Sequence, residues 1–211
     1  MESRCRLVVM ASGNGSNAQA IIDACAAGRL PAQVSAVVSD RAEAHALVRA
    51  DDAGLPAVHV GKRPGETRAD YDARLADIVS GFDPDYVVLA GWMRILTLNF
   101  LGWFPSMVVN LHPALPGELP GTHAIGRAFD QFVAGTRSHT GVMVHMVPDE
   151  GVDDGPVLAS ERVDILPADT LDTLEARMHA VEHRVLVGAL HDLCRARLAE
   201  RDLTHRNGAP A

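Results

Sequence analysis

The sequence predicts an α/β fold in which an open, doubly wound and mostly parallel sheet forms a single domain. Short apolar runs recur along the first half of the chain, for example Arg6–Ala11 (RLVVMA) and Asp85–Ala90 (DYVVLA). Stretches in which apolar residues have helical spacing separate these runs. Strands that are apolar throughout are buried on both faces, which is typical of a parallel sheet with helices on each side.

The elements of the first half can be assigned in order. The first strand, 6–11, leads into a glycine-rich turn at 12–16 and then into a helix at 17–27 whose apolar residues share one face. The alternation continues with a strand at 33–39, a helix at 42–53, a short strand at 57–60, a helix at 68–79, and strands at 85–90 and 106–112. Sheets of this kind bind ligands at the carboxyl ends of their strands, where loops and helix N-termini converge.

The second half of the chain changes character. A stretch with three prolines, 111–121, is too long for a tight turn and predicts a shaped surface loop. The remaining elements are a helix at 125–133, strands at 141–147 and 157–165 on either side of an acidic turn at 149–155, and a long amphipathic helix at 171–193. Because no repeat or linker interrupts the chain, we expect one domain over residues 1–205 and a disordered polar tail over 206–211.

Composition excludes several classes of protein. The 211 residues carry a formal net charge of -8, which gives no electrostatic footprint for nucleic acid or an anionic membrane. The three cysteines form no CxxC pair, so neither a disulfide framework nor a zinc knuckle is expected. No run approaches the about 18 apolar residues of a membrane span, and the start MESRCR does not resemble a signal peptide. We therefore expect a soluble, cytoplasmic protein without nucleic-acid or membrane partners, as a monomer or a homodimer.

The turn after the first strand is a candidate anion site. In Gly13–Ala18 (GNGSNA), the glycines allow close backbone approach, and the following helix N-terminus offers free N–H groups to a phosphate. Ser16 and Asn17 add side-chain donors or cap the helix. The same residues also satisfy GxGxxG/A, and Asp40 lies near the end of the second strand, where a dinucleotide site has its ribose-binding acid. The residues therefore leave a phosphate site and a dinucleotide site open.

A second candidate site lies at the end of the fifth strand. Asn110 and His112 are two residues apart, so in an extended backbone they share a face. A carboxamide can donate to a developing oxyanion, and an imidazole can move protons near neutral pH. A carboxylate from the acidic turn 149–155 would raise the pKa of His112 if the fold brought the two together. The alternatives are a buried Asn–His pair that fixes the proline-rich loop, and a solvated acidic turn.

The long C-terminal helix contains an HxxEH pattern, His179–His183 (HAVEH), which matches a class of zinc enzymes. The pattern fixes only three positions in a chain with ten histidines, and the helix is rich in arginine and glutamate. Exposed or capping histidines explain it more simply, and we expect no metal.

Taken together, these motifs resemble the phosphoribosylglycinamide formyltransferase family, folate-dependent enzymes of purine synthesis. The matching pieces are VVMASGNGSNAQAII (8–22), VVLAGWMRIL (87–96), NLHPAL (110–115), GVMVHMV (141–147), VDDGPVL (152–158) and, more weakly, VEH (181–183). They span nearly the whole chain in the order of the family. Each piece alone is unspecific, but the combination is highly specific.

The resemblance implies a Rossmann-like formyltransferase fold and formyl transfer from 10-formyltetrahydrofolate, as co-substrate, to the amine of 5-phosphoribosylglycinamide, without a metal. Three groups of residues fall on functional positions of the family. The catalytic positions are Asn110, His112 and Asp153; the ribonucleotide positions are Gly15, Ser16, Asn17 and Glu182; the folate positions are Arg68, Met93, Arg94, Ile95, Leu96, Asn110 and Val147. The N-terminal half is thus expected to bind the nucleotide, and the C-terminal half to carry folate and catalytic loops.

Two departures from the family pattern bear on these assignments. The proline-rich loop contains Glu118, an acid near the expected anionic substrate, and the acidic turn is one residue longer before the catalytic acid. We assign Asp153 rather than Asp154 because it directly follows Val152. Other users of formyltetrahydrofolate share the catalytic trio, but methionyl-tRNA formyltransferases and formyltetrahydrofolate hydrolases carry an additional domain and are not expected to have the GNGSN turn. A nicotinamide-dinucleotide-binding protein and a nucleotide sensor without turnover remain as alternatives from other classes.

Overall fold

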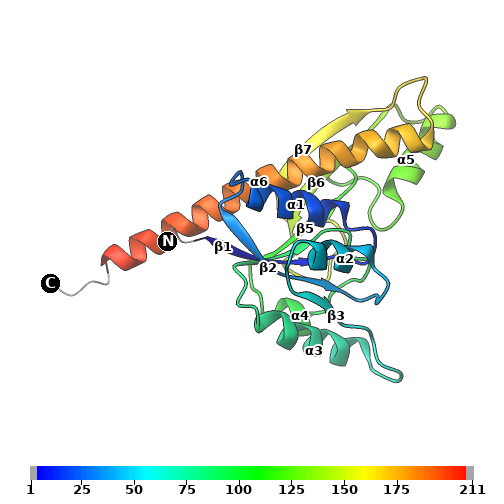
Figure 1. Cartoon of the computed structure of the whole chain (residues 1–211). Coiled ribbons are helices and arrows are strands. Elements are labelled where there is room, and N and C mark those ends of the chain that lie inside the picture. Colours follow the sequence, from blue (N-terminus) through cyan, green and yellow to red (C-terminus); the bar gives the residue numbers. More distant parts are fainter. Residues whose placement is uncertain (1–3, 208–211) are drawn as a thin grey trace.

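Seven strands form one sheet at the centre of the computed structural model, which describes residues 4–207 (Figure 1). They are β1 (Cys5–Met10), β2 (Ala32–Ser39), β3 (Ala57–His59), β4 (Tyr86–Leu89), β5 (Val108–His112), β6 (His139–Met146) and β7 (Val157–Asp164). The order across the sheet is β3-β2-β1-β4-β5-β6-β7, and the neighbours from β3 to β5 pair parallel whereas β6 and β7 pair antiparallel. The predicted open, mostly parallel sheet is confirmed.

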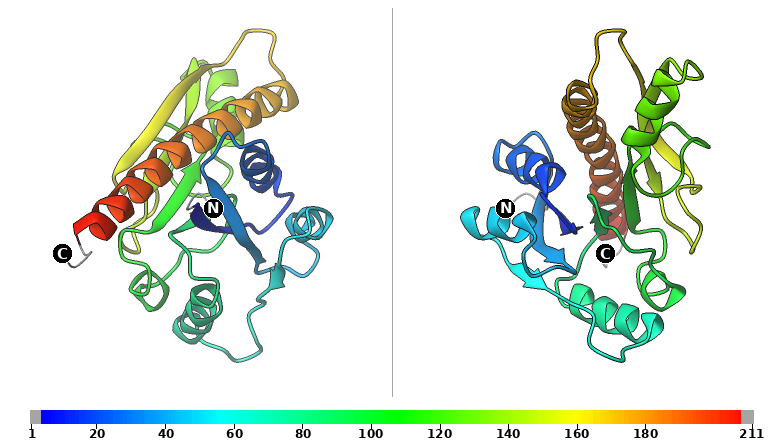
Figure 2. Two further views of the ribbon diagram at one scale, coloured as in Figure 1. Left: turned by 60° about the vertical axis from the view of Figure 1, so that its left-hand side comes forward. Right: turned by 90° about the vertical axis from the view of Figure 1, so that its right-hand side faces the viewer.

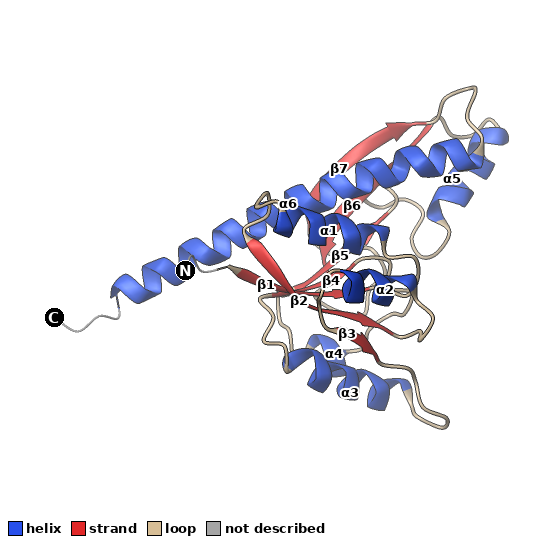
Figure 3. Ribbon diagram, viewed as in Figure 1, coloured by secondary structure: helices blue, strands red, loops and turns tan. Residues whose placement is uncertain are grey.

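Helices cover both faces of this sheet (Figure 2, Figure 3). They are α1 (Ser16–Ala26), α2 (His45–Asp52), α3 (Arg68–Ser80), α4 (Leu98–Leu101), α5 (Ala124–Val133) and α6 (Leu171–Asn207). One apolar core joins the sheet to α1, α2, α5 and α6, and a second core joins its other face to α3 and α4. The strands show why both cores exist: in β1, Leu7 and Val9 belong to the first core and Val8 and Met10 to the second.

Two helices differ from expectation. The short α4 has too few residues for a periodicity to appear in the sequence. Helix α6 does not end near Leu193 but continues to Asn207 and projects beyond the sheet (Figure 1). Its extension is held to the domain at Arg197 and Arg201, which pair with the buried carboxylate of Asp85. Residues 208–211 of the expected tail lie outside the described residues.

In the part of the chain that the structure describes, none of the helices combines the length and the apolar character needed to cross a membrane.

The strand order reverses next to β1. The chain moves outward from β1 to β2 and β3, then returns to place β4 on the other side of β1. At such a switch point the loops after neighbouring strands diverge and leave a crevice at the carboxyl edge of the sheet. The turn before α1, the segment after β4 and the end of β5 all lie at this edge.

Candidate active site

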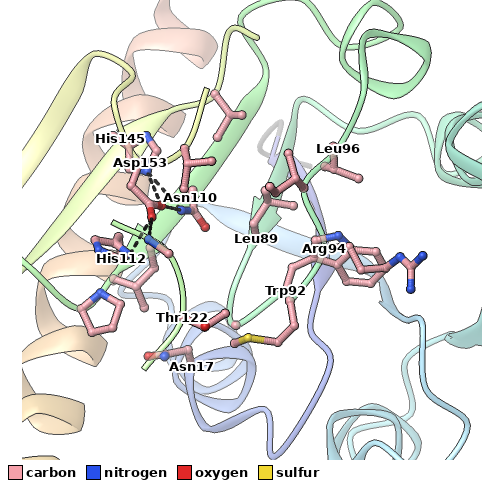
Figure 4. A pocket seen from close by; sticks show the side chains of 18 of the residues that line it. Asn17, Leu89, Trp92, Arg94, Leu96, Asn110, His112, Thr122, His145 and Asp153 are labelled. Carbon is pink, nitrogen blue, oxygen red and sulfur yellow. Dashed lines mark hydrogen bonds and ion pairs between the residues drawn. The ribbon is translucent and has the colours of Figure 1, made fainter. Parts of the chain in front are cut away.

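A cavity of about 340 Å³ opens at this edge, beside the ends of β4 and β5 (Figure 4). It brings together the expected catalytic residues, most of the expected folate residues and part of the expected nucleotide site. Those that line it are Asn17, Met93, Arg94, Ile95, Leu96, Asn110, His112, Val147, Asp153 and Glu182. Gly15, Ser16 and Arg68 do not line this cavity.

Asn110, His112 and Asp153 lie together at one wall of the cavity, and we call them the polar cluster (Figure 4). Asn110 and His112 project from the same face of β5, as the strand periodicity predicts. Asp153 comes from the connection between β6 and β7. Its Oδ2 lies 3.2 Å from Nδ1 of His112, and its Oδ1 accepts a hydrogen bond of 3.0 Å from Nδ2 of Asn110.

The loop that carries Asp153 is held in a defined shape. Asp153 has a φ of 55°, in the left-handed region that few residues other than glycine adopt, and its Oδ2 accepts a hydrogen bond of 2.8 Å from the N–H of Gly121. Behind it, Gly155 packs so closely that a Cβ would lie 1.9 Å from the carbonyl oxygen of Met146. The next acid, Asp154, is exposed. These contacts agree with the choice of Asp153 over Asp154.

His112 is only 4% exposed, and both of its ring nitrogens face acceptors: Nδ1 the carboxylate of Asp153, and Nε2 the carbonyl of Leu119 at 3.0 Å. Burial lowers the pKa of His112 below its ordinary value, while Asp153 and the Leu119 carbonyl raise it part of the way back. The sequence predicts that a carboxylate of the acidic turn raises the pKa of His112 where the two meet; Asp153 acts in that direction, but burial outweighs it, and the lowered pKa favours the neutral imidazole near pH 7. Burial also acts to raise the pKa of Asp153, but contacts with His145 and the Gly121 N–H outweigh it and hold the carboxyl below its usual value.

His145 belongs to this wall and was missed in the sequence. It lies opposite Asn110 in the β5–β6 pair, is 2% exposed, and its Nε2 is 3.1 Å from Nδ2 of Asn110. Its Nδ1 faces the carbonyl of Met146 at 2.8 Å, and its Nε2 also lies 3.6 Å from Oδ1 of Asp153. Both amide hydrogens of Asn110 are therefore directed at His145 and Asp153. Only the register between β5 and β6 identifies His145, and the residue pattern of one strand does not contain it.

The expected nucleotide residues lie where β1 meets α1. Gly15 caps α1 with a φ of 75°, and Ser16 borders a neighbouring cavity of about 790 Å³. Nδ2 of Asn17 donates a hydrogen bond of 2.9 Å to Oε2 of Glu182 on α6, so residues from both halves of the chain meet at the expected nucleotide site. Burial acts to raise the pKa of Glu182, but hydrogen bonds from His179 and Asn17 outweigh it and hold the pKa below its ordinary value. Glu182 is thus a buried carboxylate at the edge of the cavity.

These contacts also explain the HxxEH pattern. Nδ1 of His179 lies 3.1 Å from Oε2 of Glu182, and His179 lines the main cavity. His183 instead borders the neighbouring cavity. The two histidines therefore do not converge, and among residues 4–207 no three His, Cys, Asp or Glu side chains are grouped so that they could hold a metal ion.

The expected folate segment, 93–96, lies across the cavity from the polar cluster (Figure 4). Met93 and Ile95 are about half exposed, whereas Leu96 is buried. Arg68 lies outside the cavity and donates two hydrogen bonds, of 2.8 and 3.1 Å, to the carbonyl oxygen of Ile95. Arg68 therefore holds the segment 93–96 in place from outside the cavity.

Arg94 turns its guanidinium away from the polar cluster (Figure 4). The guanidinium lies 4.8 Å from the ring centroid of Tyr71 and 3.7 Å from Oδ2 of Asp40. Asp40 is the acid that a dinucleotide site would use to bind ribose, and here it is engaged in an ion pair. Of the two sequence features that support a dinucleotide site, the glycine-rich turn and Asp40, only the turn remains available.

Glu118, the acid of the proline-rich loop, does not line the cavity. It forms an ion pair with Arg137, which precedes β6. Arg137 compensates its charge, and Glu118 lies outside the cavity expected to bind the substrates.

Comparison with known proteins agrees with this geometry. Residues 5–190 match the formyl transferase family. The chain is 41% identical over 197 residues to the phosphoribosylglycinamide formyltransferase of Dictyostelium discoideum, covering 87% of this chain and 95% of that protein. It is 43% identical over 199 residues to that of Schizosaccharomyces pombe, covering 89% and 96%. The crystal structure of glycinamide ribonucleotide transformylase 1 from Symbiobacterium toebii superposes with a TM-score of 0.86 at 37% identity, covering 92% of this chain and 89% of that one. The chain therefore belongs to the phosphoribosylglycinamide formyltransferase family of formyl transferases.

Proposed function

We propose that this enzyme transfers the formyl group of 10-formyltetrahydrofolate to the amine of 5-phosphoribosylglycinamide, a step of purine synthesis that releases tetrahydrofolate. The observation that carries the proposal is one cavity that the polar cluster, the largely apolar segment 93–96 and the polar pair Asn17–Glu182 line together. Two small-molecule substrates, one bound at the segment and one at the polar pair, would both reach His112.

The proposed reaction starts from the neutral imidazole of His112, which its lowered pKa favours. A neutral imidazole can accept the proton of the attacking amine. General acid–base catalysis of this kind increases a reaction rate about 10²- to 10⁴-fold. The imidazolium is then stabilised by the Asp153 carboxylate, whose Oδ2 lies 3.2 Å from Nδ1. The proton can pass on to the folate nitrogen that leaves. Because Nε2 faces Leu119, that contact must open when the substrates bind.

The oxygen of the formyl group becomes negatively charged when the amine attacks the formyl carbon. Asn110 supplies the amide donor for this oxyanion, and the His112 imidazolium adds positive charge. In the free protein the amide hydrogens of Asn110 are directed at Asp153 and His145. Donation to the oxyanion therefore requires Asn110 to exchange one of these partners.

The two ends of the cavity suit the two substrates. Leu89 and Trp92 give an apolar lining that fits a planar pterin ring. At the other end, the Glu182 carboxylate and Asn17 suit the hydroxyl groups of a ribonucleotide. The free N–H groups at the start of α1, beside Ser16, suit its phosphate.

Replacing Gly15 by alanine is expected to weaken nucleotide binding selectively. Alanine is strained at a φ of 75°, and its Cβ would lie 2.6 Å from Cβ of Ala46, so the start of α1 or α2 must move. We expect the KM for phosphoribosylglycinamide to rise about 10-fold or more, the effect of losing one charge-assisted phosphate contact, while the KM for formyl-folate stays unchanged. Gly28→Ala is the matched control, because Gly28 also has a positive φ (68°) but open space around it. Equal KM changes in both variants would contradict the phosphate assignment.

The proposed reaction is tested by mixing the purified protein with both substrates and following the absorbance of the tetrahydrofolate product. Turnover that depends on phosphoribosylglycinamide is expected; no product at micromolar enzyme would overturn the proposal. Release of formate without the nucleotide would instead favour a hydrolase.

Calorimetric titration separates the remaining alternatives. Tight binding of NAD or NADP would restore the dinucleotide hypothesis, which leaves the polar cluster without a role. Binding of phosphoribosylglycinamide without turnover would indicate a sensor.

A further inference from the structure

The two walls at the folate end of the cavity are linked by a hydrogen bond. One wall is the segment 93–96, and the other is the loop 149–153, of which Asp149, Gly151, Val152 and Asp153 line the cavity. The backbone N–H of Leu98 donates to Oε1 of Glu150 at 3.0 Å. Leu98 is the first residue of α4, so its N–H has no acceptor within that helix. The Glu150 carboxylate, from the loop of the other wall, supplies one.

The first wall is fixed to the body of the domain. Arg68 donates twice to the carbonyl of Ile95, and the buried carboxylate of Asp72 accepts a hydrogen bond of 2.6 Å from the N–H of Thr97. Beyond these contacts, Phe100 of α4 is fully buried in the second core. Helix α3 and the core therefore hold this wall independently of the loop.

The second wall has much less support at its tip. Residues 149–152 are exposed, and the hydrogen bond within the tip joins the N–H of Gly151 to Oδ1 of Asp149 at 2.8 Å. The other end of the loop is tied to the polar cluster through Asp153. Exposed segments with few buried contacts open locally at low free energy. The contact of Glu150 with Leu98 ties this tip to the rigid wall.

We propose that Glu150 is a positioning residue that sets the distance between the two walls and steadies the loop that delivers Asp153. The inference rests on the proposed binding of formyl-folate between these walls. We call the hydrogen bond between Glu150 and the Leu98 N–H the bridge. Because it forms before the substrate arrives, less conformational entropy of the loop is lost when the substrate binds. Glu150 therefore acts on folate affinity without touching the nucleotide end.

Two substitutions test the bridge. Glu150→Ala removes the acceptor, and the KM for 10-formyltetrahydrofolate should rise about 3- to 10-fold, as the loss of one hydrogen bond predicts. The KM for phosphoribosylglycinamide should not change. Glu150→Gln keeps an oxygen at the same position and should restore most of the affinity. Asp52→Ala, an exposed acid of α2 that does not line the cavity, is the control and should leave both KM values at the wild-type level.

Hydrogen exchange followed by mass spectrometry tests the same bridge without an activity assay. In Glu150→Ala, the peptide that covers 148–156 should exchange faster than in the wild-type protein, and in the peptide that covers 93–101 the increase should correspond to the Leu98 amide, which loses its acceptor. In the wild-type protein, 5-formyltetrahydrofolate, a stable isomer of the co-substrate, should protect both. Unchanged exchange in Glu150→Ala, or a parallel rise of both KM values, overturns the bridge.

The two proposals fail differently. If the wild-type protein transfers formyl groups and the Glu150 variants match it, only the bridge is rejected. If the wild-type protein binds no folate, the proposed function is rejected together with the bridge.

Discussion

His112→Asn is expected to lower kcat by about 10²- to 10⁴-fold, the usual contribution of a general acid–base catalyst. The asparagine amide can replace Nδ1 of His112 as a donor to Asp153, so the variant keeps one side of the native contact. It cannot accept a proton from the attacking amine near neutral pH. Both KM values should change little, because the segment 93–96 and the pair Asn17–Glu182 are untouched. Steady-state kinetics with each substrate varied in turn measures the separation of kcat from KM.

His139→Asn is the matched control for this experiment. His139 begins β6, at the opposite end of that strand from His145, and is partly exposed. Its kinetics should equal those of the wild-type protein, and thermal unfolding should show that both variants are folded. A kcat for His112→Asn within about 10-fold of the wild-type value would remove His112 from the proton transfer.

The sheet and part of the polar cluster could be predicted because they follow from local periodicity. Strands such as β1 are apolar on both faces, and this pattern appears directly in the sequence. Asn110 and His112 share a face of β5 because side chains alternate along any strand. Asp153 is different: its carboxylate reaches His112 through a loop with a left-handed residue and a tightly packed glycine at 155, and only the resemblance to a family pointed to it.

Other features depend on contacts between elements that are distant in the sequence. His145 enters the site through the pairing of β5 with β6. The direction of the Arg94 guanidinium is set by Tyr71 and Asp40, which come from different elements. The low pKa of His112 results from burial by the surrounding loops, which no pattern in the NLHP segment encodes. In each case the side chain was visible in the sequence, but its surroundings were not.

Asp153→Asn is expected to lower the maximum rate by about 10²-fold or more, as the loss of one preorganised electrostatic partner predicts. The carboxylate raises the pKa of His112 against the effect of burial, because a negative charge favours the imidazolium. The amide removes that charge, so the pKa of His112 falls further below its ordinary value. Since the proposed reaction starts from neutral His112, the acid limb of the pH–rate profile should move to lower pH in the variant.

The loss of rate has a second source in the hydrogen-bond geometry. The two oxygens of Asp153 face three donor groups, on Asn110, His112 and the backbone of Gly121. The side chain of asparagine has one acceptor oxygen, so its NH₂ group must face at least one of these donors. The imidazolium formed during the reaction therefore loses both its counter-charge and its orientation, whereas substrate affinity should change little.

Asp154→Asn serves as the control, because Asp154 is the neighbouring acid in the same turn and is exposed. Its pH–rate profile and maximum rate should match those of the wild-type protein. If Asp154→Asn strongly lowered the maximum rate and Asp153→Asn hardly changed it, the assignment of the catalytic acid in this longer turn would be off by one residue. The role of Asp153 would then be lost, but formyl transfer would stand, because it rests on the whole cavity and not on the choice between two adjacent acids.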